Sequence, residues 1–229
     1  MSQRRRAPGV PFYYPDWLEV HEIERDVRAA LREFGRGRLL DVGCGAMPYR
    51  VYGDLITDWI GFDSIENQGA DVHGSADALP FPDASFDTVL CTQLLEHVEH
   101  PGKVLAECAR ILTPEGSLVV TAPQYWELHE EPRDYYRYTM NGLRYLVENA
   151  GLKVLRTCSQ GIAPALGAQS LNLMMLHAGE RWPLMRTWPV RAAKVPFYAV
   201  VNLMALACAS LFRNSRDAMN HLIVAAKPH

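Results

Sequence analysis

The chain has 229 residues, of which 48% are hydrophobic and 21% charged, and these proportions are typical of one soluble globular domain with a large core. The formal net charge of −3 provides no chain-wide positive field, so nucleic acid is not expected as a partner. The five cysteines form no C-x-x-C pair, which argues against a disulfide framework or a zinc site. No signal peptide is recognisable. We therefore expect a single cytoplasmic domain over 1–229.

Periodic apolar residues divide the chain into alternating helices and strands. The N-terminal region, 1–37, contains a predicted helix that begins near Asp16, where Asp16 and Glu19 have capping-box spacing, and ends at the glycines 35 and 37. Further helices are predicted between Pro101 and Leu112 and from a Thr139 cap to Gly151. Short apolar runs predict buried strands at 38–42, 59–63, 86–91, 117–123 and 152–158, and a last strand within 219–229.

Strands separated by helical crossovers imply a mostly parallel sheet. The expected fold class is α/β, doubly wound, with a helical insertion before the last strand. In such sheets ligands bind beyond the carboxyl ends of the strands, so we expect the functional residues to follow the strands directly.

A glycine-containing loop, "LLDVGCG", follows the first predicted strand. Gly43 and Gly45 allow a tight turn and close approach of the backbone to a ligand, and Asp63 closes the next strand as an acceptor for ribose hydroxyls. Pro48 occupies the third glycine position of a dinucleotide fingerprint, so that pattern is incomplete. From these residues alone, an ordinary turn and a dinucleotide site both stay open.

The segments "LLDVGCG", "GFD" and "GSADALPFPDASFDTVLCTQLLEHVEHPGKVLAECARILTPEGSLVVTAP" resemble, in order and spacing, the class I S-adenosylmethionine-dependent methyltransferases. The resemblance covers roughly residues 38–123 and continues more loosely to about 155. It implies a Rossmann-like fold whose last strand runs antiparallel beside the sixth, and S-adenosylmethionine as the cofactor. Met47 departs from the family, in which many members carry glycine there. The resemblance places these residues at the cofactor: Asp41, Gly43 and Gly45 at its methionine part, Asp63 at the ribose, Asp77 and the Ala78 backbone at the adenine, and Gln93 beyond the fourth strand.

The segment "QLLEHVEH", residues 93–100, supplies two candidate pocket residues. Some quinone-pathway members of the family carry a metal-associated E-x-x-E-H segment, but Gln93 replaces the first acid here. We therefore expect no metal, and we assign Glu96 and His97 to loop positioning and pocket lining, with His97 as a second candidate for the chemistry.

"HEEPRDYYRYT", residues 129–139, follows the predicted fifth strand and resembles a segment found in a subset of these methyltransferases. His129 is the candidate general base, and Arg133 and Arg137 could hold an anionic acceptor. The alternative is a loop pinned by its own salt bridges, with its tyrosines packed on the sheet edge. Possible acceptor contacts are Tyr125, Trp126, Arg133, Tyr135, Tyr136 and Tyr138.

The predicted insertion, 161–218, contains 18 consecutive uncharged residues at 195–212. Pro196 and Asn202 argue against a membrane-spanning helix. A lid helix is the first interpretation, and an interfacial helix that meets lipid or a lipid-linked substrate is the second.

The sequence therefore predicts methyl transfer to a small-molecule or carrier- or lipid-linked acceptor, at oxygen or nitrogen. The alternative is a cofactor-binding scaffold or regulator of the same fold that transfers no methyl group. The predicted localisation is cytoplasmic, with peripheral membrane contact through 195–212 as an open alternative. Neither the acceptor nor the oligomeric state follows from the sequence.

Overall fold

The computed structural model describes residues 10–65, 69–182, 187–209, 211 and 217–228. Within these residues the chain divides into two compact units. The first comprises residues 24–158 together with 221–228, and the second comprises 10–23 together with 159–220. The expectation of one domain over 1–229 stays a prediction.

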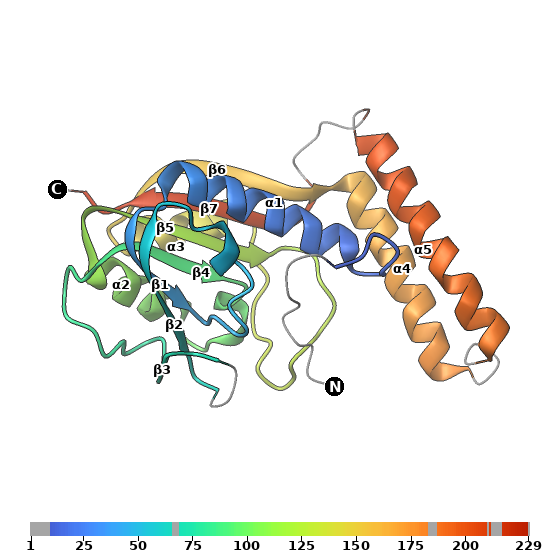
Figure 1. Ribbon diagram of the computed structural model, residues 1–229, viewed down its shortest axis with the longest axis horizontal. Helices are drawn as coiled ribbons and strands as arrows, with labels where there is room; N and C mark the ends of the chain where they lie inside the picture. The colour runs from blue at the N-terminus through green and yellow to red at the C-terminus, as the bar shows by residue number, and fades with distance from the viewer. Residues whose placement is uncertain (1–9, 66–68, 183–186, 210, 212–216, 229) are drawn as a thin grey trace. The chain divides into compact units, whose positions relative to one another are not determined.

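A seven-stranded sheet has the order β3-β2-β1-β4-β5-β7-β6 (Figure 1). Neighbouring strands from β3 through β5 pair in parallel. Lys227, just after β7, exchanges backbone hydrogen bonds with Glu115 and Gly116 near the start of β5, so β7 runs antiparallel to β5. The strands are β1 (Gly37–Val42), β2 (Ile56–Asp63), β3 (Val72–His73), β4 (Phe86–Thr92), β5 (Leu112–Pro123), β6 (Lys153–Ile162) and β7 (Ala218–Ala226).

Two crossover helices connect the strands as the sequence predicts. Helix α2 (Pro101–Ile111) joins β4 to β5, and α3 (Met140–Asn149) joins β5 to β6. The side chain of Thr139 accepts a hydrogen bond from the backbone of Gly142, which confirms Thr139 as the cap. The earlier connections differ, because the crossover from β1 to β2 contains only the short 3-10 helix η1 (Arg50–Tyr52), and β3 precedes β4 without a helix.

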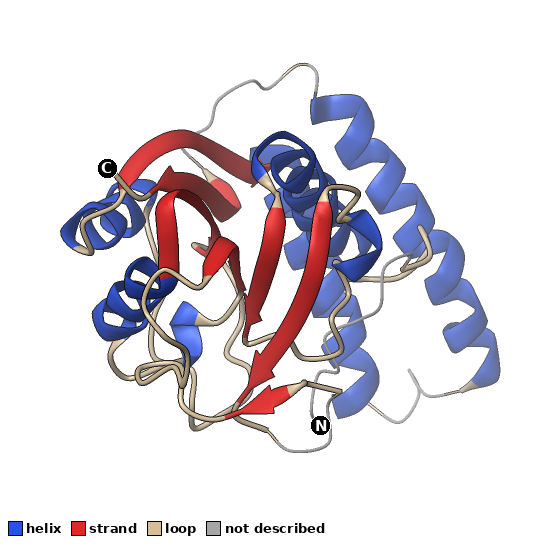
Figure 2. Ribbon diagram, turned by 60° about the vertical axis from the view of Figure 1, so that its left-hand side comes forward, coloured by secondary structure: helices blue, strands red, loops and turns tan. Residues whose placement is uncertain are grey.

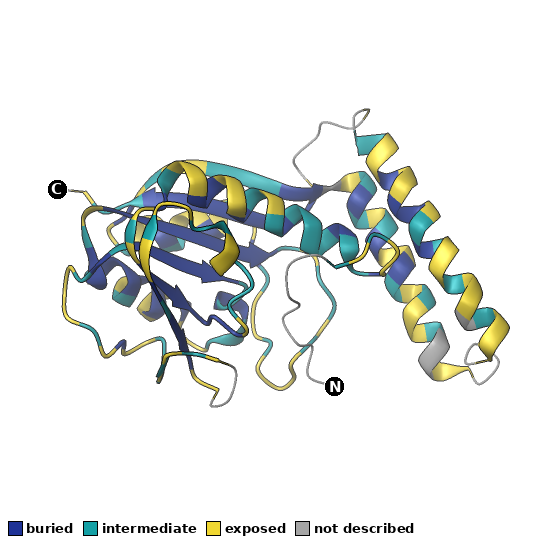
Figure 3. Cartoon of the chain, in the orientation of Figure 1, coloured by how far each residue is buried: buried dark blue, intermediate teal, exposed yellow. Residues whose placement is uncertain are grey.

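The core of the first unit lies between the sheet and its helices, which occupy both faces (Figure 2). Leu40 and Val42 of β1 join one buried cluster with Leu105 of α2 and Val147 of α3. Strand side chains alternate between faces, so Leu39 and Asp41 point the other way. Both are buried as well, and the central strands are dark along their length in Figure 3. Burial of both faces explains why these strands have continuous apolar sequences.

The second unit contains the N-terminal part of α1 (Trp17–Phe34) and the helices α4 (Ala163–Arg181) and α5 (Trp188–Ala209), which pair with each other. Nδ2 of Asn172 in α4 donates to Oδ1 of Asn202 in α5 at 2.9 Å. Both asparagines also donate to backbone carbonyls between Phe12 and Pro15. These buried amides fix the register of the helix pair, since an unpaired amide in an apolar contact is costly.

Candidate functional site

Asp63, at the carboxyl end of β2, is bound to the glycine loop that follows β1. The backbone N–H of Gly45 donates to Oδ2 of Asp63 at 2.9 Å, and the N–H of Ile65 donates to Oδ1 at 3.1 Å. The N–H groups of Gly43 and Cys44 donate to the carbonyl of Phe62. The loop therefore folds onto the end of β2 through the backbone and one carboxylate.

Gly43 brings the backbone of this loop close to its neighbours. Its φ is +71°, and a Cβ at this position would lie 2.9 Å from Cδ1 of Leu94. Glycine is needed for both reasons. Met47, at the position where many members of the family carry glycine, adopts a φ of 50°, and its Sδ lies 2.7 Å from where a Cβ on Gly61 would stand. The loop thus packs through Met47 against β2.

Asp77 lies in the loop after β3, and its conformation is set locally. Oγ of Ser75 donates to Oδ1 of Asp77 at 2.5 Å. Further along this loop, Arg110 of α2 donates to the carbonyls of Leu79 and Phe81 and forms an ion pair with Glu107. The hydrogen bonds that Arg110 donates to the Glu107 carboxylate are the largest cause that lowers the pKa of Glu107, and the backbone N–H of Leu79 acts in the same direction. The helix thereby anchors the loop that carries Asp77.

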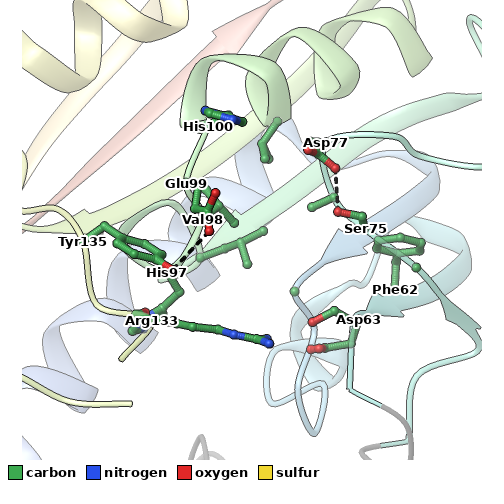
Figure 4. Close-up of a pocket in the computed structure, with 16 residues that line it drawn as sticks. Phe62, Asp63, Ser75, Asp77, His97, Val98, Glu99, His100, Arg133 and Tyr135 are labelled. Atoms are coloured by element: carbon green, nitrogen blue, oxygen red, sulfur yellow. Dashed lines mark hydrogen bonds between the residues drawn. The ribbon is translucent and has the colours of Figure 1, made fainter. Parts of the chain in front are cut away.

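A cavity of about 360 Å³ joins these segments, within the range of small-molecule sites. One wall contains Gly43, Asp63 and Asp77. The opposite wall contains His97, Glu99 and His100, which follow β4, and Arg133 and Tyr135, from the segment after β5. Figure 4 shows the side chain of Arg133 extending across the cavity toward Asp63.

Backbone hydrogen bonds hold the two segments of this second wall together. Nδ1 of His97 donates to the carbonyl of Arg133 at 2.6 Å, and the N–H of Tyr135 donates to the carbonyl of Glu96 at 2.8 Å. The hydroxyl of Tyr136 donates to the carbonyl of Glu99. The Arg133 backbone is thus fixed, while none of the described residues forms a hydrogen bond or ion pair with its guanidinium. This group can therefore bind an anion.

His129 lies behind His97 and does not line the cavity. The two rings meet edge to face, with centroids 4.7 Å apart. Nδ1 of His129 lies 3.1 Å from the carbonyl of Glu127 and 3.3 Å from Oδ2 of Asp134. A carbonyl only accepts, so Nδ1 donates its proton and the lone pair of the neutral ring is on Nε2. Of the two predicted catalytic histidines, only His97 faces the cavity.

Asp134 is the buried anchor of the segment after β5. It accepts from the backbone N–H of His129 and from both terminal nitrogens of Arg137. Arg137 also donates to the carbonyls of Trp126, Glu127 and Tyr136. The hydrogen bonds from Arg137 lower the pKa of Asp134 to about 2, and the His129 backbone contributes in the same direction. Arg137 is therefore a structural residue rather than an acceptor contact.

Several other predicted residues lie outside the cavity lining. Asp41 is buried beneath the glycine loop, and the N–H of Ala78 donates to the carbonyl of Ser75. Nε2 of Gln93 donates to Oγ1 of Thr121.

Except for Tyr135, the predicted aromatic contacts also lie outside the lining. Tyr138 belongs to the core, and its hydroxyl donates to the carbonyl of Leu95. Its side chain is therefore not available to an acceptor. Tyr125 is exposed and Trp126 is half-buried. Tyr136 donates to the carbonyls of Glu96 and Glu99 through its backbone N–H and its hydroxyl, and it does not line the cavity.

The sequence pattern assigns no role in the site to Asp134 or Glu99, and it predicts His100 at the surface. A signal for Asp134 was present, because Asp134 and Arg137 have the i, i+3 spacing of an ion pair. No comparable signal marks Glu99 or His100, since their orientation depends on how the segment after β4 turns.

Glu96, His97 and His129 form a cluster that could hold a metal ion. Each offers one ligand atom, and these atoms lie within 4.8 Å of one another. Both histidines donate Nδ1–H to backbone carbonyls, an arrangement common for metal-binding imidazoles. The expectation that no metal is present stays a prediction.

The cavity fits S-adenosylmethionine by the chemistry of its lining. Carboxylates at the ends of successive strands can accept from ribose and adenine donors, and Gly43 leaves room that a Cβ would fill. Residues 40–120 match a family model described as "Methyltransferase domain". A probable S-adenosylmethionine-dependent methyltransferase from Mycolicibacterium smegmatis is 37% identical over 122 residues, which cover 47% of this chain and 45% of that protein. Over residues 40–120 the chain therefore carries a methyltransferase domain of the kind found in class I S-adenosylmethionine-dependent methyltransferases.

Two further comparisons extend the similarity to other proteins. A ubiquinone/menaquinone biosynthesis C-methyltransferase from Hahella chejuensis is 36% identical over 95 residues, 42% of this chain and 30% of that protein. The chain therefore spans less than half the length of these two curated relatives. The crystal structure of the [4+2]-cyclase SpnF shares the fold, with a TM-score of 0.57 and 21% identity over 99% of this chain and 84% of that one. The predicted family, fold class and cofactor are confirmed.

Proposed function

We propose that this protein transfers a methyl group from S-adenosylmethionine to a small-molecule or carrier-linked acceptor. The observation that carries the proposal is one cavity whose two walls differ in chemistry. Gly43, Asp63 and Asp77 supply the cofactor side, and His97, Arg133 and Tyr135 supply the acceptor side. When bound, S-adenosylmethionine supplies an electrophilic methyl on a sulfonium, which becomes a neutral thioether once the acceptor lone pair bonds to the methyl carbon.

The residues of the second wall have distinct roles in this proposal. An oxygen acceptor must lose a proton, and Nε2 of His97 carries the lone pair in the neutral ring because Nδ1 donates to Arg133. Carboxylates of Glu96 and Glu130 lie 3.7 and 3.9 Å from this Nε2 and would stabilise the imidazolium that forms. His129 and Asp134 hold the His97 ring from behind.

Arg133 favours an acceptor that carries a negative charge near the reacting atom. Its guanidinium extends into the cavity from a fixed backbone (Figure 4), and a planar guanidinium suits carboxylate or phosphate. We propose oxygen or nitrogen as the accepting atom. Methylation at carbon is the competing outcome, because the chain is similar to a C-methyltransferase of quinone biosynthesis.

The test has two stages. Calorimetry with S-adenosylmethionine and S-adenosylhomocysteine is expected to show binding that Asp63→Ala removes; absence of binding by the wild-type protein would refute the proposal. Methyl-labelled cofactor added to a lysate of the source organism should then label a small or carrier-linked product, whose mass and fragmentation identify the accepting atom.

A second candidate function is cofactor binding without methyl transfer. This second candidate rests on the fold similarity to a [4+2]-cyclase, because proteins that share a fold need not catalyse the same reaction. Tight binding of S-adenosylmethionine with no labelled product from any acceptor pool would support this second function and exclude the first.

A further inference from the structure

The outer faces of helices α4 and α5 carry a concentration of exposed apolar side chains. On α5 the side chains of Val200, Leu203 and Met204 are 54%, 61% and 62% exposed, and on α4 Met174 is 61% exposed. Val200, Leu203 and Met204 have the i, i+3, i+4 spacing of one helix face. Soluble proteins rarely leave large contiguous apolar patches uncovered unless the patch meets a partner or a membrane.

This exposed face is a fixed feature of the helix pair rather than a consequence of loose packing. The Asn172–Asn202 hydrogen bond sets the register of α4 against α5, and Asn202 is held from the other side by the carbonyls of Phe12 and Tyr14. Ala205 and Val201 are buried on the inner side of α5. The polar inner contacts therefore commit one side of α5 to protein and leave the apolar side outward, as the alternation of buried and exposed residues in Figure 3 shows.

By length and composition alone, α5 is the one helix among the described residues that could cross a membrane. An 18-residue stretch within it has a mean hydropathy of 1.5, and 22% of that stretch is buried. The buried Asn202 and the internal Pro196 argue against a spanning orientation. A helix that keeps one face on protein and offers the other to lipid lies along the surface instead.

Charge distinguishes a lipid surface from other occupants of this face. Residues 163–216 contain six lysine or arginine residues and one acidic residue, whereas the rest of the chain contains 17 basic and 25 acidic residues. A second copy would bring the same positive charge toward its own image, which is unfavourable. An anionic lipid surface attracts basic residues beside an apolar helix face.

We propose that the α4–α5 helix pair binds the surface of an anionic lipid bilayer through its exposed apolar side chains, Met174 on α4 and Val200, Leu203 and Met204 on α5. This goes beyond methyl transfer, and an inactive protein would still bind. Lys194, on the first half of α5, lies in the same acid-poor segment and contributes attraction to the lipid headgroups.

The experiment is sedimentation of the full chain with vesicles of phosphatidylcholine alone or of phosphatidylcholine and phosphatidylglycerol in equal parts. The wild-type protein is expected to sediment with the anionic vesicles at low salt, and less with neutral vesicles or at high salt. The double variant Leu203→Glu/Met204→Glu should bind the anionic vesicles about tenfold more weakly or worse. The matched control is Val51→Glu/Leu55→Glu, which changes two side chains that are 68% and 64% exposed in the first unit and should bind as the wild type does.

Binding of S-adenosylmethionine and the thermal unfolding curve establish that each variant is folded. Three results would overturn the proposal: no sedimentation of the wild-type protein with anionic vesicles, an equal loss in both double variants, or a dimer in analytical ultracentrifugation that Leu203→Glu/Met204→Glu converts to a monomer. The last result would assign the face to a second copy of the chain.

Discussion

The backbone N–H of Gly45 donates to Oδ2 of Asp63 across 2.9 Å, so one carboxylate both closes the glycine loop and faces the cavity. Oδ1 accepts from Ile65, which fixes the plane of the carboxylate. The orientation needed to accept from ligand hydroxyls is therefore set by folding and costs little when the ligand binds.

Asp63→Asn is expected to weaken S-adenosylmethionine binding by about tenfold to a hundredfold, because an amide offers one oxygen to two backbone donors and points its N–H₂ at one of them. Calorimetry measures the change. Asp58→Asn, on the exposed part of the same strand where Asp58 pairs with Arg38, should leave the affinity within about twofold. Equal losses in the two variants would contradict a specific role for Asp63.

The cofactor side of the site could be predicted from the sequence because its residues depend on local structure. Gly43 and Gly45 follow one strand, Asp63 ends the next, and each position is set within a few residues by a strand end and a turn. The Thr139 cap was predictable for the same reason. Parallel pairing then brings these strand ends to one edge of the sheet.

The acceptor side depended on contacts that the sequence does not show. Which histidine faces the cavity is decided by Asp134 and Arg137, which turn the segment so that His129 lies behind His97. The sequence pattern predicts Tyr138 as an acceptor contact together with the neighbouring aromatic residues, but its hydroxyl donates to the carbonyl of Leu95 and the ring enters the core. Side chains of the same type, two histidines or several tyrosines, thus take different positions because of tertiary hydrogen bonds that the sequence does not reveal.

His97→Gln should lower kcat by about a hundredfold or more if the acceptor is a hydroxyl, since general-base catalysis typically contributes factors of that order. Binding of S-adenosylmethionine should change little. His129→Gln should have a smaller effect on kcat, because His129 reaches the cavity only through the His97 ring. His177→Gln on α4 serves as the control. Unchanged turnover in His97→Gln would remove it from the proton transfer.

Arg137→Lys should destabilise the protein by about 2–4 kcal/mol, since lysine cannot replace the paired hydrogen bonds to buried Asp134 and to three carbonyls. Denaturant unfolding measures this change. Arg156→Lys, which alters an exposed pair with Glu33, should cost less than about 1 kcal/mol. A stable Arg137→Lys protein that binds its acceptor more weakly would assign Arg137 to the substrate instead.

Turnover should survive treatment with EDTA, because the sequence favours a metal-independent reaction. Loss of turnover in EDTA would instead point to a metal ion at the Glu96–His97–His129 cluster. Addition of Mn²⁺ or Zn²⁺ after EDTA would then raise the melting temperature and the activity of the wild-type protein but not of His129→Gln. Restoration of activity in the wild type alone would make the cluster a metal site.

His221, in strand β7, should make the free energy of unfolding depend on pH in a defined window. Burial lowers its pKa to about 4, and its Nε2 bonds with Oε1 of Gln124 just beyond β5. The unfolded chain takes up a proton near pH 6.5, while the folded chain does so only near pH 4. Stability from neutral His221 is therefore complete above about pH 6.5 and is lost as the pH falls toward 4, by up to about 1.4 kcal/mol per pH unit.

Urea unfolding at a series of pH values between 7 and 4 checks this expectation. His221→Asn removes the titrating group and should flatten the decline in this range, and His177→Asn, at an exposed position on α4, is the control. Asp134 acts at lower pH, because a pKa lowered to about 2 loses its stabilising effect only as the pH falls below the ordinary aspartate value of about 4. A decline between pH 6.5 and 4 that is as steep in His221→Asn as in the wild type would mean that another group, and not the buried imidazole beside Gln124, carries the acid sensitivity of this fold.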